Sequence, residues 1–318
     1  MTTDRSIDAS SLADRKLGFL FREGSYFDLG ILRIIAVATS LLFLIFISRF
    51  GIEGAFYLSG DFYRPLPALK ILMLPFGWGT RPEPWLVNSI YWITIATGIT
   101  ALVGFRTNIS LLIYAIGNIF LTAFIYSFSD LHHREAVMAV ILFALALSPS
   151  GRVLSVDNRM GKGFNGLVDS TAASSTHSPY AYWPILLLQI FFALMYFSAV
   201  VWKHQSGLGW ANGFTLQAYL VQDGIRHNSP IALWFSQFHY FIYFVQLIVV
   251  TFQATFFLII FFPKLRWIYI PIGLVFHIGI LLTLTAPFYQ WIALYMGFIP
   301  WSNLREIISG RRKIIDLF

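Results

Sequence analysis

The chain has 318 residues, of which 57% are hydrophobic and 12% are charged, and its mean hydropathy is +0.69. These values exclude an ordinary soluble globular protein and are typical of a chain that crosses a membrane several times. The formal net charge is +7 and there is no cysteine, so disulfides and thiolate catalysis are excluded, and nothing indicates nucleic acid binding.

The N-terminal segment, residues 1–28, is polar and is expected to be cytoplasmic. The first apolar run lacks a small-residue cleavage pattern, which predicts an uncleaved anchor rather than a signal peptide. About eight stretches approach the roughly 20 apolar residues that a spanning helix needs. Two of them, the fourth and the last, are short enough to be tilted or partly embedded. The predicted spans cover residues 31–48, 85–103, 109–127, 136–147, 184–202, 238–262, 267–284 and 291–301.

These spans predict an all-α fold, a polytopic bundle of about eight transmembrane helices over residues 29–302. Residues 51–84, which mix prolines, aromatics and both charge signs, are expected to form an outer-face cap with an embedded helical piece. Lys and Arg are concentrated in the N-terminal segment, alternate loops and the basic tail at 303–318, so both termini are predicted to be cytoplasmic. The tail can lie on anionic lipid, and Lys203 is expected to face outward.

Several ionisable side chains near or within the spans are candidate functional groups. His132 and His133 lie in a polar cluster between the third and fourth spans, Lys203 and His204 follow the fifth, and His277 interrupts the seventh. An ionisable side chain within a span is costly unless it faces the bundle interior or water, which makes His277 a candidate. Each also has a structural interpretation: a packing hydrogen bond for His277, snorkelling for Lys203, and a solvated loop for the histidine pair.

The sequence gives little support for three other kinds of chemistry. The histidines and Glu135 could supply metal ligands, but no set of them has a metal-site spacing and HExxH is absent, so no metal is expected. The GxSxG pattern of serine hydrolases and the GxxxxGK[ST] phosphate loop are also absent.

Three longer segments and an early span containing Arg33 occur in a recognisable order. The segments are HHREAVMAVILFALALSPSGRVLSVD, YFSAVVWKHQSGLGWANGFTLQAYL and FHIGILLTLTAPFYQWIALYMGFIPW. Together they resemble the horizontally transferred transmembrane (HTTM) family, which is related to the membrane domain of vitamin K-dependent γ-glutamyl carboxylase. The resemblance implies a membrane enzyme that uses a reduced quinone, similar to vitamin K hydroquinone, with O2 and CO2.

The resemblance also implies roles for individual residues. Lys203, followed by a W-x-x-G pattern at Trp210, matches the lysine that deprotonates the quinol. His133, or else His132, falls near a histidine implicated in positioning the peptide glutamate or the reactive base. His277 resembles a histidine in a later span.

Aromatic side chains near Lys203 could bind the quinone head group as it enters from lipid. Tyr196, Phe197, Trp202 and Trp210 are the candidates, and each could equally be an ordinary interface anchor. An apolar setting would favour the neutral form of Lys203, which could then act as a base.

At 318 residues the chain has no room for the extended lumenal part that binds the carboxylase's protein substrate, so that substrate is not expected to transfer. The leading hypothesis is a carboxylase-like enzyme of the bacterial cytoplasmic membrane that modifies a secreted peptide or protein at the outer face. A non-catalytic factor that binds and helps mature or export a peptide, and a quinone or lipid carrier, are the alternatives.

Overall fold

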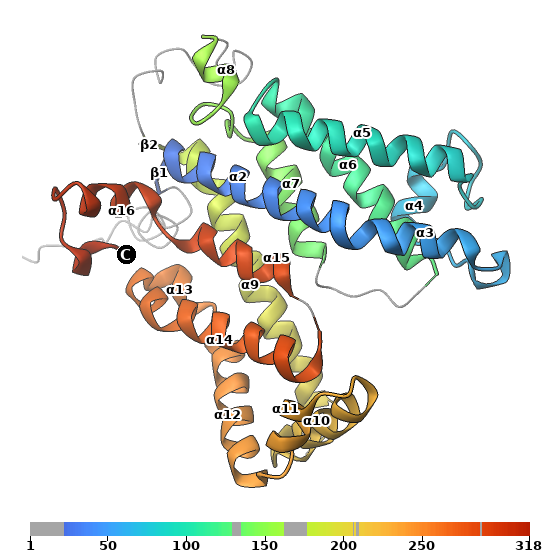
Figure 1. Ribbon diagram of the computed structural model, residues 1–318. Coiled ribbons are helices and arrows are strands. Elements are labelled where there is room, and N and C mark those ends of the chain that lie inside the picture. Colours follow the sequence, from blue (N-terminus) through green and yellow to red (C-terminus); the bar gives the residue numbers. More distant parts are fainter. Residues whose placement is uncertain (1–21, 129–134, 162–176, 206, 208–209, 287) are drawn as a thin grey trace, which may run out of the picture.

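The computed structural model describes residues 22–128, 135–161, 177–205, 207, 210–286 and 288–318. This part of the chain forms an all-α bundle, which confirms the predicted fold class, with one short ribbon of two antiparallel strands, β1 (Gly24–Ser25) and β2 (His177–Ser178) (Figure 1). Five helical segments are long and apolar enough to cross a membrane, as expected of an integral membrane protein. They are Tyr26–Tyr57, Pro84–Val103, Thr107–Tyr126, Pro179–Gln205 and Pro263–Leu284.

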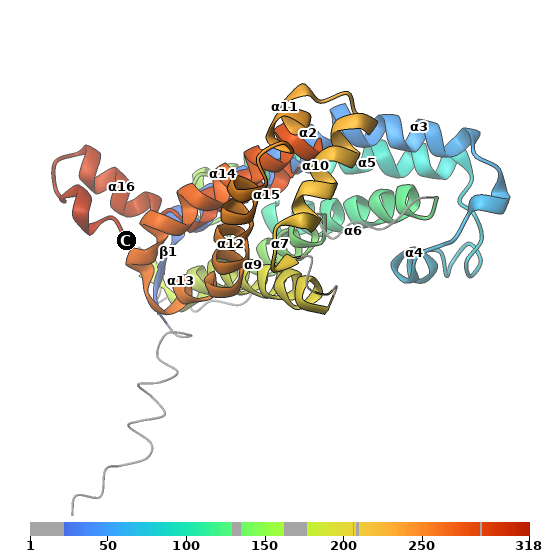
Figure 2. The same cartoon turned by 90° about the horizontal axis from the view of Figure 1, so that it is seen from below.

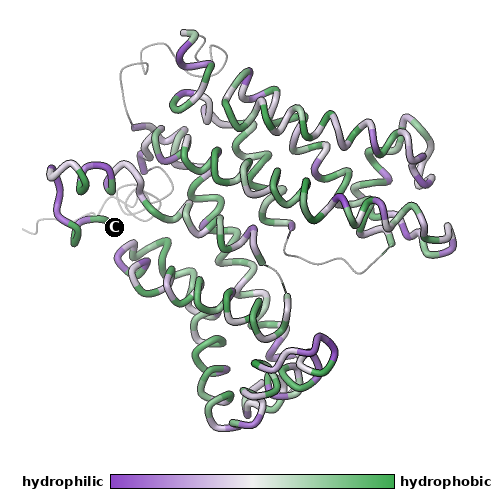
Figure 3. Tube along the Cα trace, in the orientation of Figure 1, coloured by the Kyte–Doolittle hydropathy of each residue, from purple (hydrophilic) through white to green (hydrophobic). Residues whose placement is uncertain are grey.

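The two ends of the bundle differ in what they carry. One end holds β1, β2, α16 and the C-terminus, and the opposite end holds α3 and α4, as both views show (Figures 1 and 2). We call the first the ribbon end. Hydrophobic residues follow the long helices, while hydrophilic residues gather at α8, at α16 and around α10 and α11 (Figure 3).

The first span is longer than predicted. Helix α2 (Tyr26–Phe43) is capped at its N-terminus by Ser25, whose side chain accepts a hydrogen bond from the backbone N–H of Phe27. It continues through a π-helical turn, Leu44–Ser48, into α3 (Arg49–Tyr57). Neither a proline nor a polar run interrupts the chain after residue 48, where we predicted the end, so the helix runs into the expected cap.

A single arginine closes the end of α3. Arg81 donates to the backbone carbonyls of Ala55, Phe56 and Leu58, at 3.0, 3.2 and 3.0 Å respectively. These carbonyls have no intrahelical partner, so a guanidinium that reaches all three stabilises the helix end. The cap also contains a 3₁₀ turn, η2 (Gly60–Phe62), and the predicted helical piece, α4 (Pro67–Leu72).

The next three predicted spans form α5 (Pro84–Val103), α6 (Thr107–Tyr126) and α7 (Ala136–Leu147). Small residues allow α5 and α6 to approach closely. A Cβ atom on Gly117 of α6 would lie only 2.0 Å from Oγ1 of Thr94 on α5. Glycine at this position therefore fixes the distance between the two helices.

The second half of the bundle is built on α9, the longest single α-helix of the described residues. Its N-terminal end lies beside the ribbon, and its C-terminal end lies near α10 and α11 (Figure 1). The elements in chain order are α9 (Pro179–Gln205), α10 (Phe214–Arg226), α11 (Pro230–Phe235), α12 (His239–Thr255), α13 (Leu258–Phe261), η6 (Pro263–Leu265) and α14 (Arg266–Leu284).

The predicted sixth span, 238–262, is divided between α12 and α13. Thr255, the last residue of α12, donates its hydroxyl to the carbonyl of Thr251 and accepts a hydrogen bond from Tyr269. A threonine that bonds back to the preceding turn competes with the helix and bends it, which accounts for the break. The apolar run gave no sign of it.

The predicted last span, 291–301, is not one helix. Pro300 separates the apolar turns before it from an amphipathic helix after it, because proline lacks an N–H and clashes with the preceding turn. The elements here are α15 (Tyr289–Leu294), η7 (Tyr295–Phe298), α16 (Trp301–Ile308) and η8 (Ile314–Asp316).

Arg33 joins the ribbon end of α2 to the turn that follows α7. Its side chain is fully buried, and it donates to the carbonyls of Ser150 at 3.1 Å and Leu154 at 2.5 Å. Because these carbonyls lie outside regular structure, the guanidinium replaces the hydrogen bonds that a helix would have supplied. Arg33 therefore has a structural role.

Asp157, on the short helix α8 (Val156–Arg159), binds the loop between α5 and α6 through hydrogen bonds. It accepts hydrogen bonds from the backbone N–H groups of Arg106 and Thr107 and from the hydroxyl of Thr107. Burial alone would raise the pKa of Asp157, but these hydrogen bonds and the positive charge of Arg33 outweigh it and lower the pKa. The folded loop thus favours the ionised carboxylate.

Candidate functional site

Lys203, in the last turn of α9, is held by an amide and an aromatic ring. Its half-buried amine donates to Oε1 of Gln253 on α12 at 2.9 Å. The amine also lies 5.0 Å from the centre of the Trp210 ring, within range of a cation–π interaction. Among the described residues, no carboxylate lies within ion-pair distance of this nitrogen.

A second glutamine of α12 holds the backbone of the turn that carries Trp210. Gln246 is fully buried and lies two helical turns from Gln253, on the same face of α12. Its Nε2 donates to the carbonyl of Trp210, and its Oε1 accepts from the N–H of Leu216 at 3.4 Å. One side chain thus fixes the backbone on both sides of the turn that carries Trp210.

Gly213, the last residue of the W-x-x-G pattern, occupies that turn with a φ of 86°. A Cβ atom there would lie 3.0 Å from the backbone of Tyr243. The position therefore needs glycine both for its left-handed conformation and for its close approach to α12.

The four aromatic candidates do not form one surface. Tyr196 is only 3% exposed and lies in the core, whereas Phe197 and Trp202 are 51% and 68% exposed on the outside of α9. Trp210 alone contacts the Lys203 amine through its ring. Exposed aromatic side chains on a spanning helix, such as Phe197 and Trp202, are suited to lipid contact.

His277, on α14, belongs to a separate buried network. It is 2% exposed, and its Nε2 lies 2.7 Å from the hydroxyl of Tyr196, which in turn lies 2.5 Å from the hydroxyl of Tyr295. Apolar rings surround the three side chains, and a Cβ on Gly273 would lie only 2.1 Å from the Tyr295 hydroxyl. The surrounding rings are those of Phe192, Phe252, Phe256, Phe276, Phe288, Trp291 and Phe298.

The two clusters are neighbours on the same helices. Tyr196 and Lys203 share one face of α9, separated by two turns or about 10.5 Å along the axis. On α12, Phe252 contacts the Tyr196 ring at 5.2 Å, and the next residue, Gln253, binds Lys203. The structure therefore brings Lys203 together with Trp210, and His277 together with Tyr196.

The remaining candidates add nothing to this geometry. His204 is exposed at the end of α9. His132 and His133 lie outside the described residues. Within the residues that the structure describes, no three His, Asp or Glu side chains gather closely enough to hold a metal ion.

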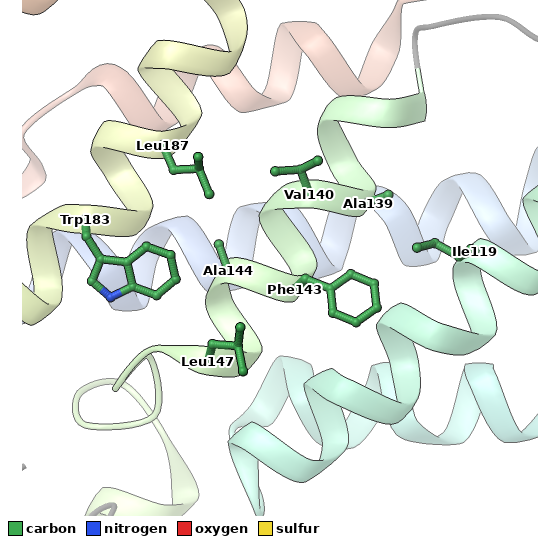
Figure 4. Close-up of a pocket in the computed structure, with 8 residues that line it drawn as sticks. All are labelled: Ile119, Ala139, Val140, Phe143, Ala144, Leu147, Trp183 and Leu187. Carbon is green, nitrogen blue, oxygen red and sulfur yellow. The ribbon is translucent and has the colours of Figure 1, made fainter. Parts of the chain in front are cut away.

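An apolar groove opens between α6, α7 and α9, with a volume of about 320 Å³ (Figure 4). Trp183 and Leu187, which line it from α9, lie 20 and 16 residues before Lys203, so roughly 24–30 Å separates groove and amine along the helix. Its lining suits a hydrocarbon chain rather than polar chemistry. The other lining residues are Ile119, Ala139, Val140, Phe143, Ala144 and Leu147.

Comparison with known proteins gives no further assignment. No protein-family model matches the chain, and no curated protein or solved structure matches it either.

Proposed function

We propose that this protein is a membrane enzyme that resembles vitamin K-dependent γ-glutamyl carboxylase and uses a reduced quinone and O2 to modify a peptide. The observation that carries the proposal is the setting of Lys203, whose amine contacts a neutral amide and an indole ring. A lysine without a carboxylate partner in a partly apolar site loses its proton more readily than a solvated or paired one. That is the property required of a general base.

The residues around Lys203 fit a quinol. Gln253 accepts one hydrogen of the amine, so the lone pair of the neutral form is available to a phenolic O–H. Trp210 provides a flat aromatic surface beside the nitrogen, against which a naphthoquinone-like ring could stack. The exposed Trp202 marks a side of α9 from which an apolar cofactor can approach through lipid.

The bound reduced quinone and O2 would supply the strong base for proton removal from the peptide, with CO2 as a further co-substrate. Lys203 accepts the quinol proton at Nζ, and Gln253 orients the amine. Gln246 holds Trp210 in place through the Trp210 carbonyl. His277, through Tyr196 and Tyr295, keeps α9 in register with α14 and η7, and His133 or His132 would contact the peptide.

The proposal places the protein in the bacterial cytoplasmic membrane, with both termini in the cytoplasm and Lys203 near the outer face. The peptide substrate then reaches the site from outside.

Oxygen consumption by the purified protein with a reduced naphthoquinone tests this proposal. Turnover should be lost in Lys203→Ala and in Lys203→Arg, since arginine keeps the charge but does not act as a base near neutral pH. Lys264→Ala is the matched control, because Lys264 is exposed at the ribbon end, near the start of α14. A Lys203→Arg variant that retains full turnover would contradict the assignment of the base.

The apolar groove favours one alternative, a quinone or lipid carrier. A carrier would bind a quinone with its hydrocarbon tail in the groove and would show no oxygen consumption (Figure 4). Ala144→Trp, which fills the groove, should then abolish quinone binding, while Lys203→Ala should leave it unchanged. No turnover and no quinone binding would instead support the non-catalytic maturation factor.

A further inference from the structure

A second buried polar cluster lies at the ribbon end of α9, far from Lys203. Its centre is Arg266, the first residue of α14, which is only 9% exposed. One nitrogen of the guanidinium donates to Oε1 of Gln189 at 3.1 Å, and another donates to the carbonyl of Phe298 at 3.4 Å. Gln189 is fully buried, so the cluster lies inside the bundle.

Three hydrogen-bond donors in this cluster have no partner among the described residues. They are Nε of Arg266, Nε2 of Gln189 and the hydroxyl of Tyr182, and all three are buried. Tyr182 and Gln189 are seven residues, or two helical turns, apart on one face of α9, and Tyr182 contributes to the electrostatic environment of Arg266. Buried donors nearly always have an acceptor, so three together indicate a missing one.

The charges lead to the same conclusion. No carboxylate of the described residues pairs with Arg266, and the other charged group that acts on it is Arg22, which is also positive. A buried guanidinium is costly unless an anion compensates its charge, and a second cation nearby increases that cost. The cluster therefore presents two positive charges and three donors, and the part of the chain that the structure describes supplies no negatively charged acceptor to it.

We propose that Arg266, Gln189 and Tyr182, with Arg22 at the exposed edge, bind a phosphate group. A phosphate offers several acceptor oxygens in the geometry that a guanidinium fork recognises, and its charge offsets both arginines. Arg266 lies near the start of a helical segment, Pro263–Leu284, that is long and apolar enough to span a membrane, so we expect it near the phosphates of one leaflet. The head group of an anionic phospholipid is therefore the natural source, and free phosphate is the other.

This site is independent of the chemistry proposed for Lys203. β1 packs against the backbone of α9 at Tyr182, since a Cβ on Gly24 would lie 2.8 Å from the Cα of Tyr182. A bound phosphate would thus connect α9, α14 and the ribbon. We expect occupancy to stabilise the bundle without altering oxygen consumption directly.

Thermal unfolding of the full-length, delipidated protein in detergent, followed by tryptophan fluorescence, tests the site with inorganic phosphate as the probe. The unfolding midpoint should rise with phosphate beyond a chloride control of equal ionic strength, because a ligand that binds only the folded state stabilises it. Tyr182→Phe removes one oxygen and should raise the half-saturating phosphate concentration about tenfold. Tyr114→Phe, which deletes a buried hydroxyl on α6 that bonds to Ser40, should keep the wild-type response.

Nanodiscs distinguish the two sources. If a phospholipid head group occupies the site, wild-type protein should be more stable in nanodiscs with phosphatidylglycerol than in purely zwitterionic ones, and added phosphate should have no further effect. If free phosphate is the ligand, the phosphate-dependent rise should persist in both nanodiscs. The proposal is overturned if phosphate and phosphatidylglycerol leave the midpoint unchanged, or if Tyr182→Phe, Gln189→Leu and Arg266→Gln all respond like the wild type.

Discussion

The buried Gln246 offers the sharpest test of how the Lys203 site is held. In Gln246→Leu, the carbonyl of Trp210 and the N–H of Leu216 lose their shared partner. Two lost hydrogen bonds cost about 1–3 kcal/mol in total, and release of Trp210 would forfeit a cation–π contact of about 0.5–1 kcal/mol with Lys203. We therefore expect a loss of about 1.5–4 kcal/mol in local stability, concentrated on the turn around Trp210.

This loss should be visible as increased access to Lys203. Amine-reactive labelling with peptide-level mass spectrometry should show faster modification of Lys203 in Gln246→Leu than in the wild type, while Lys264 reacts at an unchanged rate. Gln237→Leu is the matched control, because Gln237 is exposed and its side chain makes no hydrogen bond to any residue that the structure describes. Equal labelling of Lys203 in wild type and Gln246→Leu would refute the idea that Gln246 holds Trp210 over the amine.

Three further predictions concern the bundle. Tyr295→Phe removes the hydroxyl that bonds to Tyr196, and thermal unfolding should show a loss of about 0.5–1.5 kcal/mol with helix content unchanged. Gly117→Ala places a methyl group against the side chain of Thr94 and should cost about 1–3 kcal/mol, whereas Gly54→Ala, with nothing within 4 Å, should be nearly neutral in the same assay. The pKa of Asp157 is lower in the folded protein than in the unfolded chain, so its contribution to stability is present above the ordinary aspartate pKa and is lost as the pH falls through the folded value. Acid unfolding of Asp157→Asn should lack this pH dependence. An acid response like that of the wild type in this variant would contradict the prediction.

The sequence was a good guide to helices and a poor guide to where they break. Long apolar runs predicted α5, α6, α9 and α14 because a span must satisfy its own backbone hydrogen bonds over a fixed thickness. The break between α12 and α13 depends on a threonine that bonds back to the previous turn, which hydropathy does not register. The division of the last predicted span, by contrast, could have been inferred from Pro300.

The candidate site was partly predictable for similar reasons. Lys203 stands out because it is charged at the end of an apolar run, and in the structure its amine lies beside Trp210. Gln246 and Gln253 were missed, although two amides seven residues apart in an apolar helix are a readable signal of a shared buried face. Tyr295 gave no signal, since a tyrosine near the end of a span is ordinarily an interface anchor.

The measurement that tests the central claim most directly is oxygen uptake by the purified protein with a reduced naphthoquinone, compared among wild type, Lys203→Ala and Lys203→Arg. Our account predicts uptake by the wild type and its loss in both variants, while each variant still unfolds in a cooperative thermal transition. Uptake that survives in Lys203→Arg, or no uptake by the wild type with any of several reduced quinones and a peptide substrate, would contradict it.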